Sequence, residues 1–356
     1  MRFRVFACAL FLCALVYPAS DFFCAWLIGM ADAGAQTAPF YAGKTVRIVT
    51  FDPVGGYNFL GRLLTRHLPK YIPGHPNFIL QVMPGAGSVI ATNYLAQVAK
   101  PDGLTLGMPN QRVYMAQLLG NKEVKFDLRK FNWLGSPDRN PSVLYMRADS
   151  AYKSIEDIVK AKVPPKCGSA GLEGASFVLA LEEILGAKLD VVSGYAEARQ
   201  VDLAVERGEV VCRFIGIAAH SNREPFLDWH AKGFDRHILQ TGRKRDRSAA
   251  DTPTIFELME RYGTSDVNRR LVQVLTAAEE FGHPLVAPPS TPPDRVKLLR
   301  QAYAKALRDP ELLAEAQKAQ WDLDPVAGED LQELARRVVE QPPAVIEQIK
   351  KILRAN

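Results

Sequence analysis

The sequence predicts an α/β protein of two lobes with a ligand cleft between them, and three features carry this prediction. Short β-branched and aromatic runs alternate with glycine turns and amphipathic helical patterns over residues 45–108. The same alternation returns over residues 166–217. Residues 284–289 are proline-stiffened and extended, as expected of a crossing between lobes. Helical patterns follow over residues 294–308, 310–320 and 328–353. Repeated strand, turn and helix units favour parallel sheets with ligand sites at the carboxyl ends of the strands.

The composition is that of an ordinary globular protein. The chain has 356 residues, of which 47% are hydrophobic and 23% are charged, enough for one or two domains with a sizeable core. Its net charge is +5, which suits acidic solutes. The one dense basic run, residues 243–247, is typical of a solvated loop, so we expect no nucleic-acid partner.

The N-terminal segment predicts export. Arg2 and Arg4 precede a long apolar stretch that ends in small residues, the pattern of a secretory signal peptide cleaved near Ala35. The alternative is an N-terminal membrane anchor, because the leader is long and residues 18–21 interrupt it. Cleavage would leave two cysteines, Cys167 and Cys212, either as one disulfide or as two buried thiols.

The segment at residues 45–62 is the first candidate for a ligand site. A buried strand pattern runs into a turn that contains Gly55 and Gly56, and a helical pattern follows. Glycine permits positive φ and close approach of a ligand, and the free N–H groups of a helix start favour an anion. The spacing matches neither a dinucleotide fingerprint nor a P-loop, so nucleotide is disfavoured. Plain strand-to-helix geometry is the alternative.

A second turn in the chain could supply the other wall of a cleft. Ser169 and Ser176 offer hydroxyl donors there, and Asn58, Asn110 and Tyr195 offer further polar contacts. Several charge-assisted hydrogen bonds, each contributing about 1.5 to 3 kcal/mol, would hold a carboxylate without a dedicated cation. A local cap or turn hydrogen bond is the alternative for each of these side chains.

Catalytic and metal-binding patterns are not evident in the sequence. No GxSxG motif occurs, and the six histidines fit surface or packing roles. Paired glutamates such as Glu279 and Glu280 fit solvated helix faces. We therefore predict no enzyme activity, no catalytic residue, no cofactor and no metal site.

Several ordered motifs carry a family resemblance. They are RIVTFDPVGGYN, VMPGAGS, CGSAGLEGAS, DTPTIFELME and PLVAPPSTPPDRVKLLRQAYAKALRDPELLAEA. Together they resemble the Bug-type solute receptors of tripartite tricarboxylate transporters over nearly all of the chain after the leader. The resemblance implies a periplasmic, type II binding protein that closes on a small organic carboxylate and delivers it to membrane permease subunits. We expect a monomer.

The resemblance also implies lobe boundaries and ligand-binding residues. Lobe 1 would comprise residues 36–142 and 282–356, and lobe 2 residues 143–281. The predicted ligand-binding residues come from two loops and three further positions: Val54, Gly55, Gly56, Tyr57, Asn58, Asn110, Ser169, Ala170, Gly171, Gly174, Ala175, Ser176, Tyr195 and Arg213.

Two positions depart from the family pattern. Asn58 stands where many members have an aspartate, and Arg213 lies in a strand that often carries an acid. Arg213 would favour a second acidic group on the solute if it faces the cleft, and would be a surface charge if it faces outward. Two other functions remain open, a ligand-dependent partner of a membrane sensor and, less favoured, a periplasmic enzyme on the same scaffold.

Overall fold

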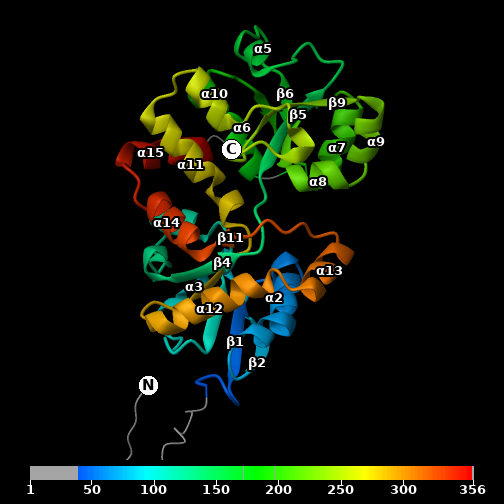
Figure 1. Ribbon diagram of the computed structural model, residues 1–356. Helices are drawn as coiled ribbons and strands as arrows, with labels where there is room; N and C mark the ends of the chain where they lie inside the picture. Colours follow the sequence, from blue (N-terminus) through cyan, green and yellow to red (C-terminus); the bar gives the residue numbers. More distant parts are fainter. Residues whose placement is uncertain (1–38, 171, 196, 355–356) are drawn as a thin grey trace, which may run out of the picture. The chain divides into compact units, whose positions relative to one another are not determined.

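The computed structural model describes residues 39–170, 172–195 and 197–354 (Figure 1). The predicted signal peptide and the predicted site residue Gly171 lie outside these ranges. The chain divides into an N-terminal unit, residues 1–40, and a second unit, residues 41–356, which carries all the elements discussed below. Among the described helices, none has both the length and the apolar character needed to cross a bilayer.

The first sheet has the strand order β11-β4-β10-β3-β1-β2. Its strands are β1 (Thr45–Thr50), β2 (Asn77–Val82), β3 (Thr105–Met108), β4 (Asn132–Ser136), β10 (Leu285–Ala287) and β11 (Val326–Ala327). The predicted alternation is confirmed for β1, β2 and β3, since β1 pairs in parallel with both others. The sheet is mixed rather than purely parallel, because the extended segment that contains β10 enters it antiparallel to β3 and β4.

The second sheet has the order β7-β6-β8-β5-β9. Its strands are β5 (Ser142–Arg147), β6 (Lys166–Gly168), β7 (Asp190–Val192), β8 (Cys212–Gly216) and β9 (Asp235–Gln240). It is also mixed: β6 pairs in parallel with β7 and β8, whereas β5 is antiparallel to β8 and β9. Cys167 lies directly opposite Cys212 on β6 and β8, and both are buried free thiols in this structure.

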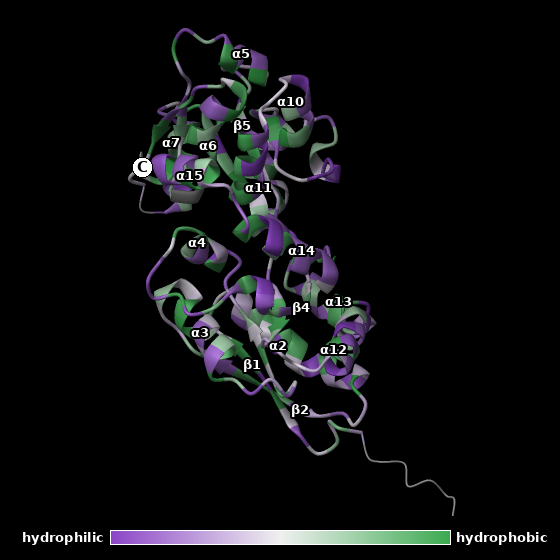
Figure 2. Ribbon diagram, turned by 90° about the vertical axis from the view of Figure 1, so that its left-hand side faces the viewer, coloured by the Kyte–Doolittle hydropathy of each residue, from purple (hydrophilic) through white to green (hydrophobic). Residues whose placement is uncertain are grey.

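Helices surround both sheets (Figure 1). They are α2 (Gly56–His67), α3 (Val89–Gln97), α4 (Val113–Leu118), α5 (Ile155–Val159), α6 (Leu172–Leu185), α7 (Ala198–Glu206), α8 (Ile217–Asn222), α9 (Phe226–Lys232), α10 (Ile255–Arg261), α11 (Asp266–Phe281), α12 (Pro293–Ala306), α13 (Pro310–Lys318), α14 (Gly328–Val339) and α15 (Pro343–Arg354). Figure 2 shows helices such as α11 and α12 alternating between hydrophobic and hydrophilic residues, as amphipathic packing requires.

The C-terminal helical segment differs from the prediction. The sequence pattern suggested one helix over residues 328–353, but the structure breaks it between α14 and α15 at Pro342 and Pro343. Proline lacks the N–H that continues a helix and disfavours helical geometry in the residue before it. Helix α15 packs on α6 and α11, both assigned above to lobe 2, although α15 itself falls in the range assigned to lobe 1. The lobe boundaries stay a prediction.

Helix α11 is the element that positions the site. It begins after Ser265, whose side chain accepts the N–H of Asn268, and ends at Gly282 with φ of 55°. Phe281 stacks on Trp133 at 4.8 Å between ring centroids, and the Tyr114 hydroxyl donates to the carbonyl of Val274 at 2.7 Å. These buried contacts fix α11 against β4 and α4.

Candidate ligand pocket

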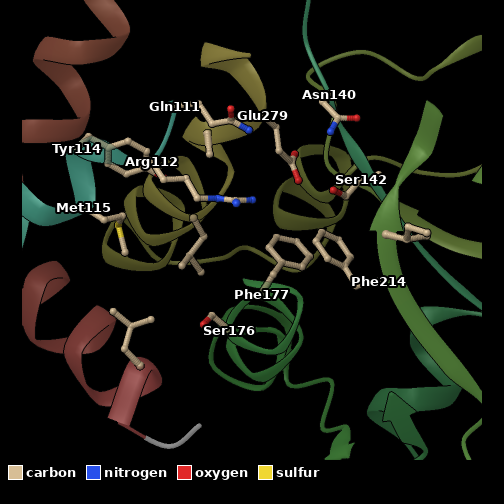
Figure 3. Close-up of a pocket in the computed structure, with 15 residues that line it drawn as sticks. Gln111, Arg112, Tyr114, Met115, Asn140, Ser142, Ser176, Phe177, Phe214 and Glu279 are labelled. Carbon is tan, nitrogen blue, oxygen red and sulfur yellow. The ribbon is translucent and has the colours of Figure 1, made fainter. Parts of the chain in front are cut away.

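A pocket of about 230 Å³ opens among α4, α6, α11, β5 and β8 (Figure 3). Its lining residues are Gln111, Arg112, Tyr114, Met115, Asn140, Ser142, Ser176, Phe177, Phe214, Ile215, Gly216, Leu275, Ala278, Glu279 and Leu353. They come from β5 and β8 of the second sheet, from helices α4, α6, α11 and α15, and from the segments just before α4 and β5. The volume suits a small solute.

Arg112 is a cationic group of this pocket. It lies just after β3, where the Asn110 side chain accepts its backbone N–H at 2.8 Å. Figure 3 shows the guanidinium pointing into the pocket. Desolvation by surrounding atoms lowers the pKa of Arg112, but guanidinium starts so high that it remains charged at neutral pH. The pocket therefore holds a fixed positive charge.

Glu279 is the acid that faces the same space (Figure 3). The Thr241 hydroxyl donates to its Oε2, and its backbone carbonyl accepts the N–H of Asn140 at 3.0 Å. Burial raises the pKa of Glu279 to about 7, because desolvation disfavours the charged form. Near neutral pH the carboxylate and carboxylic acid forms of this side chain are thus both populated, and the acid form can donate a hydrogen bond.

One wall of the pocket is aromatic. The rings of Phe177 and Phe214 stack with centroids 4.4 Å apart and an interplanar angle of 16°. Ser176, which is buried, precedes Phe177 on α6 and also lines the pocket. Polar and charged groups on one side and rings on the other suit a ligand with an acidic end and a short carbon skeleton.

The predicted first loop is engaged by a carboxylate of the chain itself. The Asp52 side chain accepts the backbone N–H groups of Val54 at 3.2 Å, Gly55 at 2.8 Å and Tyr57 at 3.3 Å. The N–H groups at a helix start favour an anion, and here the Asp52 carboxylate already fills that role. A solute carboxylate would have to displace Asp52 to use these donors, and binding by this loop stays a prediction.

The two glycines of this loop serve packing and not an unusual backbone conformation. Gly55 caps α2 with φ of −85°, and Gly56 is not among the residues with positive φ. A Cβ on Gly56 would lie 2.6 Å from Cη2 of Trp321 and 3.1 Å from Nε2 of His283. The expectation that positive φ explains these glycines is therefore wrong. The close approach of the Trp321 and His283 side chains explains why residue 56 is a glycine.

Tyr57 connects the first loop to the pocket. Its hydroxyl donates to Oε1 of Gln111 at 2.6 Å and accepts the backbone N–H of Gln111 at 2.7 Å. Desolvation raises the pKa of Tyr57, so the hydroxyl keeps its proton. Asn58 instead bonds within its own helix region, to the Asp52 carbonyl at 3.4 Å and to Nε of Arg62 at 2.8 Å.

In the second loop, Ser176 is the predicted residue that lines the pocket. Ser169 is buried and its N–H donates to the Val192 carbonyl at 2.9 Å, while Ala170 is exposed. Gly174 and Ala175 lie in the first turns of α6, and Ala175 is buried. Tyr195 is half-buried next to Gly168.

Arg213 lies in β8, where it forms a buried ion pair with Asp202 of α7. It is not among the residues that line the pocket. The sequence analysis considered an Arg213 side chain that faces the cleft or one that faces outward. The structure shows a third arrangement, in which Asp202 balances the buried charge. Its role as a ligand contact stays a prediction.

Sequence reasoning missed several residues of the pocket, above all Arg112 and Glu279. A signal for Arg112 was present, because it follows the predicted site residue Asn110 by two positions. Glu279 was interpreted as part of a solvated face. Its spacing of four from Leu275 places both on one helix face, and both line the pocket.

Residues 72–194 match the sequence model of a family described as "Tripartite tricarboxylate transporter family receptor". The predicted resemblance to this family is confirmed. Members of the family are receptors by that description. Comparison with curated proteins gives no match.

Solved structures share the fold of this receptor family. A TctC solute binding protein from Polaromonas has a TM-score of 0.68 and 18% identity, covering 89% of this chain and 100% of that protein. Rpa4515 from R. palustris with adipate has a TM-score of 0.54 and 18% identity over 87% of this chain and 97% of its own. MatC from Rhodopseudomonas palustris with bound malate has a TM-score of 0.51 and 18% identity over 87% and 99%. The two-lobed type II binding-protein fold is confirmed.

Proposed function

We propose that this chain is a periplasmic solute receptor that captures a small organic carboxylate between its two lobes for delivery to a tripartite tricarboxylate-type transporter. The observation that carries the proposal is the Arg112 guanidinium in a pocket lined by the segment after β3 of the first sheet and by β5 and β8 of the second. The family description and the adipate and malate found in two similar structures support a carboxylate as the class of solute.

Different residues of the pocket contact different parts of such a solute. The planar guanidinium of Arg112 presents parallel N–H donors that match a carboxylate in bidentate fashion. Ser176 and Gln111 offer further polar groups, and the stacked Phe177 and Phe214 cover a short carbon chain. Glu279 in its protonated form donates to a second oxygen of the solute.

Closure of two lobes around the solute is the movement expected of this fold. The hydroxyl of Tyr57 bonds Gln111, and so holds the segment that presents Arg112. The N-terminal leader pattern supports export and the periplasmic location.

The test is a ligand screen of the protein exported with its own leader and purified. Organic mono- and dicarboxylates, amino acids and sugars are compared by thermal shift, and hits are measured by calorimetry. Carboxylates should raise Tm by an amount that grows with concentration. Stabilisation by uncharged sugars or by amines alone would contradict the proposal.

Arg112→Gln gives the residue-level test of the same proposal. Loss of a charge-assisted contact of about 1.5 to 3 kcal/mol should weaken carboxylate binding about 10- to 100-fold. The matched control is Arg129→Gln, which removes an exposed arginine that pairs with Asp127 outside the pocket. Equal affinities of the Arg112 variant and the unchanged protein would place the solute elsewhere.

A further inference from the structure

Three histidines and one aspartate meet at the edge of the second sheet, away from the residues that line the ligand pocket. They are His220 on α8, His230 on α9, and Asp235 and His237 on β9. Each offers one ligand atom, and the four atoms lie within 4.8 Å of one another. Figure 1 shows α8, α9 and the edge strand β9 on the same side of this sheet region.

The local structure explains why these residues converge. Asp235 and His237 are two positions apart in a strand, so their side chains leave the same face. Helices α8 and α9 pack against each other and bring His220 and His230 to that face. The three elements are short, and their sequence gives no periodic pattern from which the cluster could be predicted.

The Asp235 carboxylate is the first sign that a cation belongs here. Its side chain is 0% exposed, as is that of His220. His220 Nε2 lies 2.9 Å from Asp235 Oδ2, but His220 Nε2 and both carboxylate oxygens are buried without an aligned hydrogen bond. Within the described part of the chain, the ion-pair partners of this carboxylate are His220 and His230, not a lysine or an arginine.

A carboxylate buried in this way is costly unless a positive charge or hydrogen bonds compensate it. A metal ion held between imidazole nitrogens and the carboxylate oxygen would supply that charge, and neutral imidazole is the form that binds a metal ion.

The hydrogen bonds of His230 orient a lone pair toward the same point. Its Nε2 lies 3.0 Å from the backbone carbonyl of His220, an acceptor, so Nε2 carries the proton. Its other ring nitrogen, Nδ1, faces Asp235 Oδ1 at 3.3 Å, so a single metal ion could contact both atoms.

His237 arranges His220 in the corresponding way. Its Nε2 lies 3.1 Å from His220 Nδ1. A proton on His220 Nδ1 donates to His237 and leaves His220 Nε2 as a lone pair beside the carboxylate. Ligating histidines commonly donate the second ring N–H to such a partner. The Tyr145 ring, stacked on His220 at 4.6 Å, and Phe226 at 4.7 Å close the cluster with apolar surface.

We propose that His220, His230 and Asp235 bind a divalent transition-metal ion of the zinc class, with His237 holding the ring of His220 in place. Two imidazole nitrogens and one carboxylate oxygen suit Zn²⁺ or Co²⁺, whereas Mg²⁺ and Ca²⁺ prefer oxygen ligands. The ion fastens α8 and α9 to the edge strand β9. Its role is structural and does not depend on the solute.

A second cluster shows what a compensated site looks like. His67, Asp309 and Glu311 also bring possible ligand atoms within 4.8 Å of one another. There the Lys70 ammonium bonds Asp309 at 3.1 Å and Glu311 at 2.6 Å. The positive charge is already present, and the same argument gives no metal site.

The experiment uses the exported protein, stripped with a chelator and titrated with ZnCl₂ by calorimetry. We expect one Zn²⁺ per chain and a raised Tm, a d–d absorption spectrum with Co²⁺, and no binding of MgCl₂. His230→Ala should weaken Zn²⁺ binding at least about 100-fold, since it removes a ligand, and His237→Gln about 10-fold, since it disturbs only an orienting partner. The control is His75→Asn, at an exposed histidine outside the cluster, which should bind as the unchanged protein does.

Absence of Zn²⁺ binding by the unchanged protein, or several weak ions per chain, would overturn the proposal. Undiminished binding by a folded His230→Ala would overturn it equally. Circular dichroism of the chelator-treated variants reports whether they fold. If His230→Ala does not fold, the Zn²⁺ stoichiometry and the Co²⁺ spectrum of the unchanged protein decide the matter.

Discussion

Replacing Glu279 by glutamine should remove a pH dependence that the pocket builds into both stability and anion binding. Glu279 shares the pocket with Arg112, and burial raises its pKa from 4.5 to about 7. The group is therefore protonated in the folded protein at pH values where the unfolded chain has already lost the proton. Glutamine has nearly the same shape and no charge to titrate.

The sign and size of the stability effect follow from the proton count. Between pH 4.5 and about 7 the folded state binds more protons than the unfolded state at this group. The free energy of unfolding therefore falls as pH rises through this window, and it stops falling above pH 7. At about 1.4 kcal/mol for each unit of pKa, the whole change is roughly 3 kcal/mol as an upper bound.

Anion binding should follow the same titration. Below about pH 7 a protonated Glu279 leaves the positive charge of Arg112 unopposed by this acid, whereas above it the carboxylate repels an anionic solute. If the solute binds only the protonated form, Kd rises by up to about tenfold for each pH unit above 7. The Glu279→Gln variant should bind with an affinity that is flat across this range.

The assay is calorimetry with the best carboxylate ligand at pH 6 to 9, together with urea unfolding at pH 5 and pH 7.5. The ligand is an acid that is fully ionised throughout. Glu280→Gln is the matched control, because Glu280 is the neighbouring residue and pairs with Arg243 outside the pocket. An unchanged pH slope in Glu279→Gln, or affinity of the unchanged protein that increases with pH, would refute the reasoning.

Three other variants test the parts around the pocket. Tyr57→Phe should weaken carboxylate binding severalfold in calorimetry while the fold persists, since it removes the hydroxyl that holds the turn before α4; an unaltered Kd would deny that hydroxyl a positioning role. Asp52→Asn should leave Kd unchanged, because the solute binds at the guanidinium, and tighter binding would locate it at the glycine turn instead. Gly328→Ala should lower the free energy of unfolding, measured by urea denaturation, by at least about 2 kcal/mol, because its Cβ would collide with the carbonyl oxygen of Trp133. A smaller loss would mean that α14 can shift away from β4.

Local patterns predicted the elements that depend on local physics. The strands β1, β2 and β3 follow from the apolar runs and their alternation with helical patterns, and the structure has them. Local patterns could not predict that β5 and β10 are antiparallel to their neighbours, because pairing direction depends on where distant segments return to a sheet. The break at Pro342 and Pro343 was readable, since two adjacent prolines end a helix whatever surrounds them.

The site was predicted in kind but not in its residues. An anion-preferring helix start could be read from residues 52–58, but the sequence did not show that Asp52 already accepts its N–H groups. Arg112 and Glu279 come together only because α11 packs against α4. The histidine cluster was missed for the same reason, since α8 and α9 are too short for a periodic signal.

Charge balance distinguishes the buried acids of this protein from one another. Asp202 is balanced by Arg213 and Asp309 by Lys70, so each is explained by the chain alone. Among the described residues, the ion-pair partners of Asp235 are histidines, and the proposed metal ion would balance its charge.

In the pocket the cation, not the acid, lacks a fixed opposite charge. Glu279 is partly protonated near neutral pH because its pKa is about 7, whereas the guanidinium of Arg112 stays charged. The residues that line the pocket then carry a net positive charge when Glu279 is protonated, and a solute carboxylate is the group that neutralises it. The same physical requirement thus selects a cation at the edge of the second sheet and an anion in the pocket.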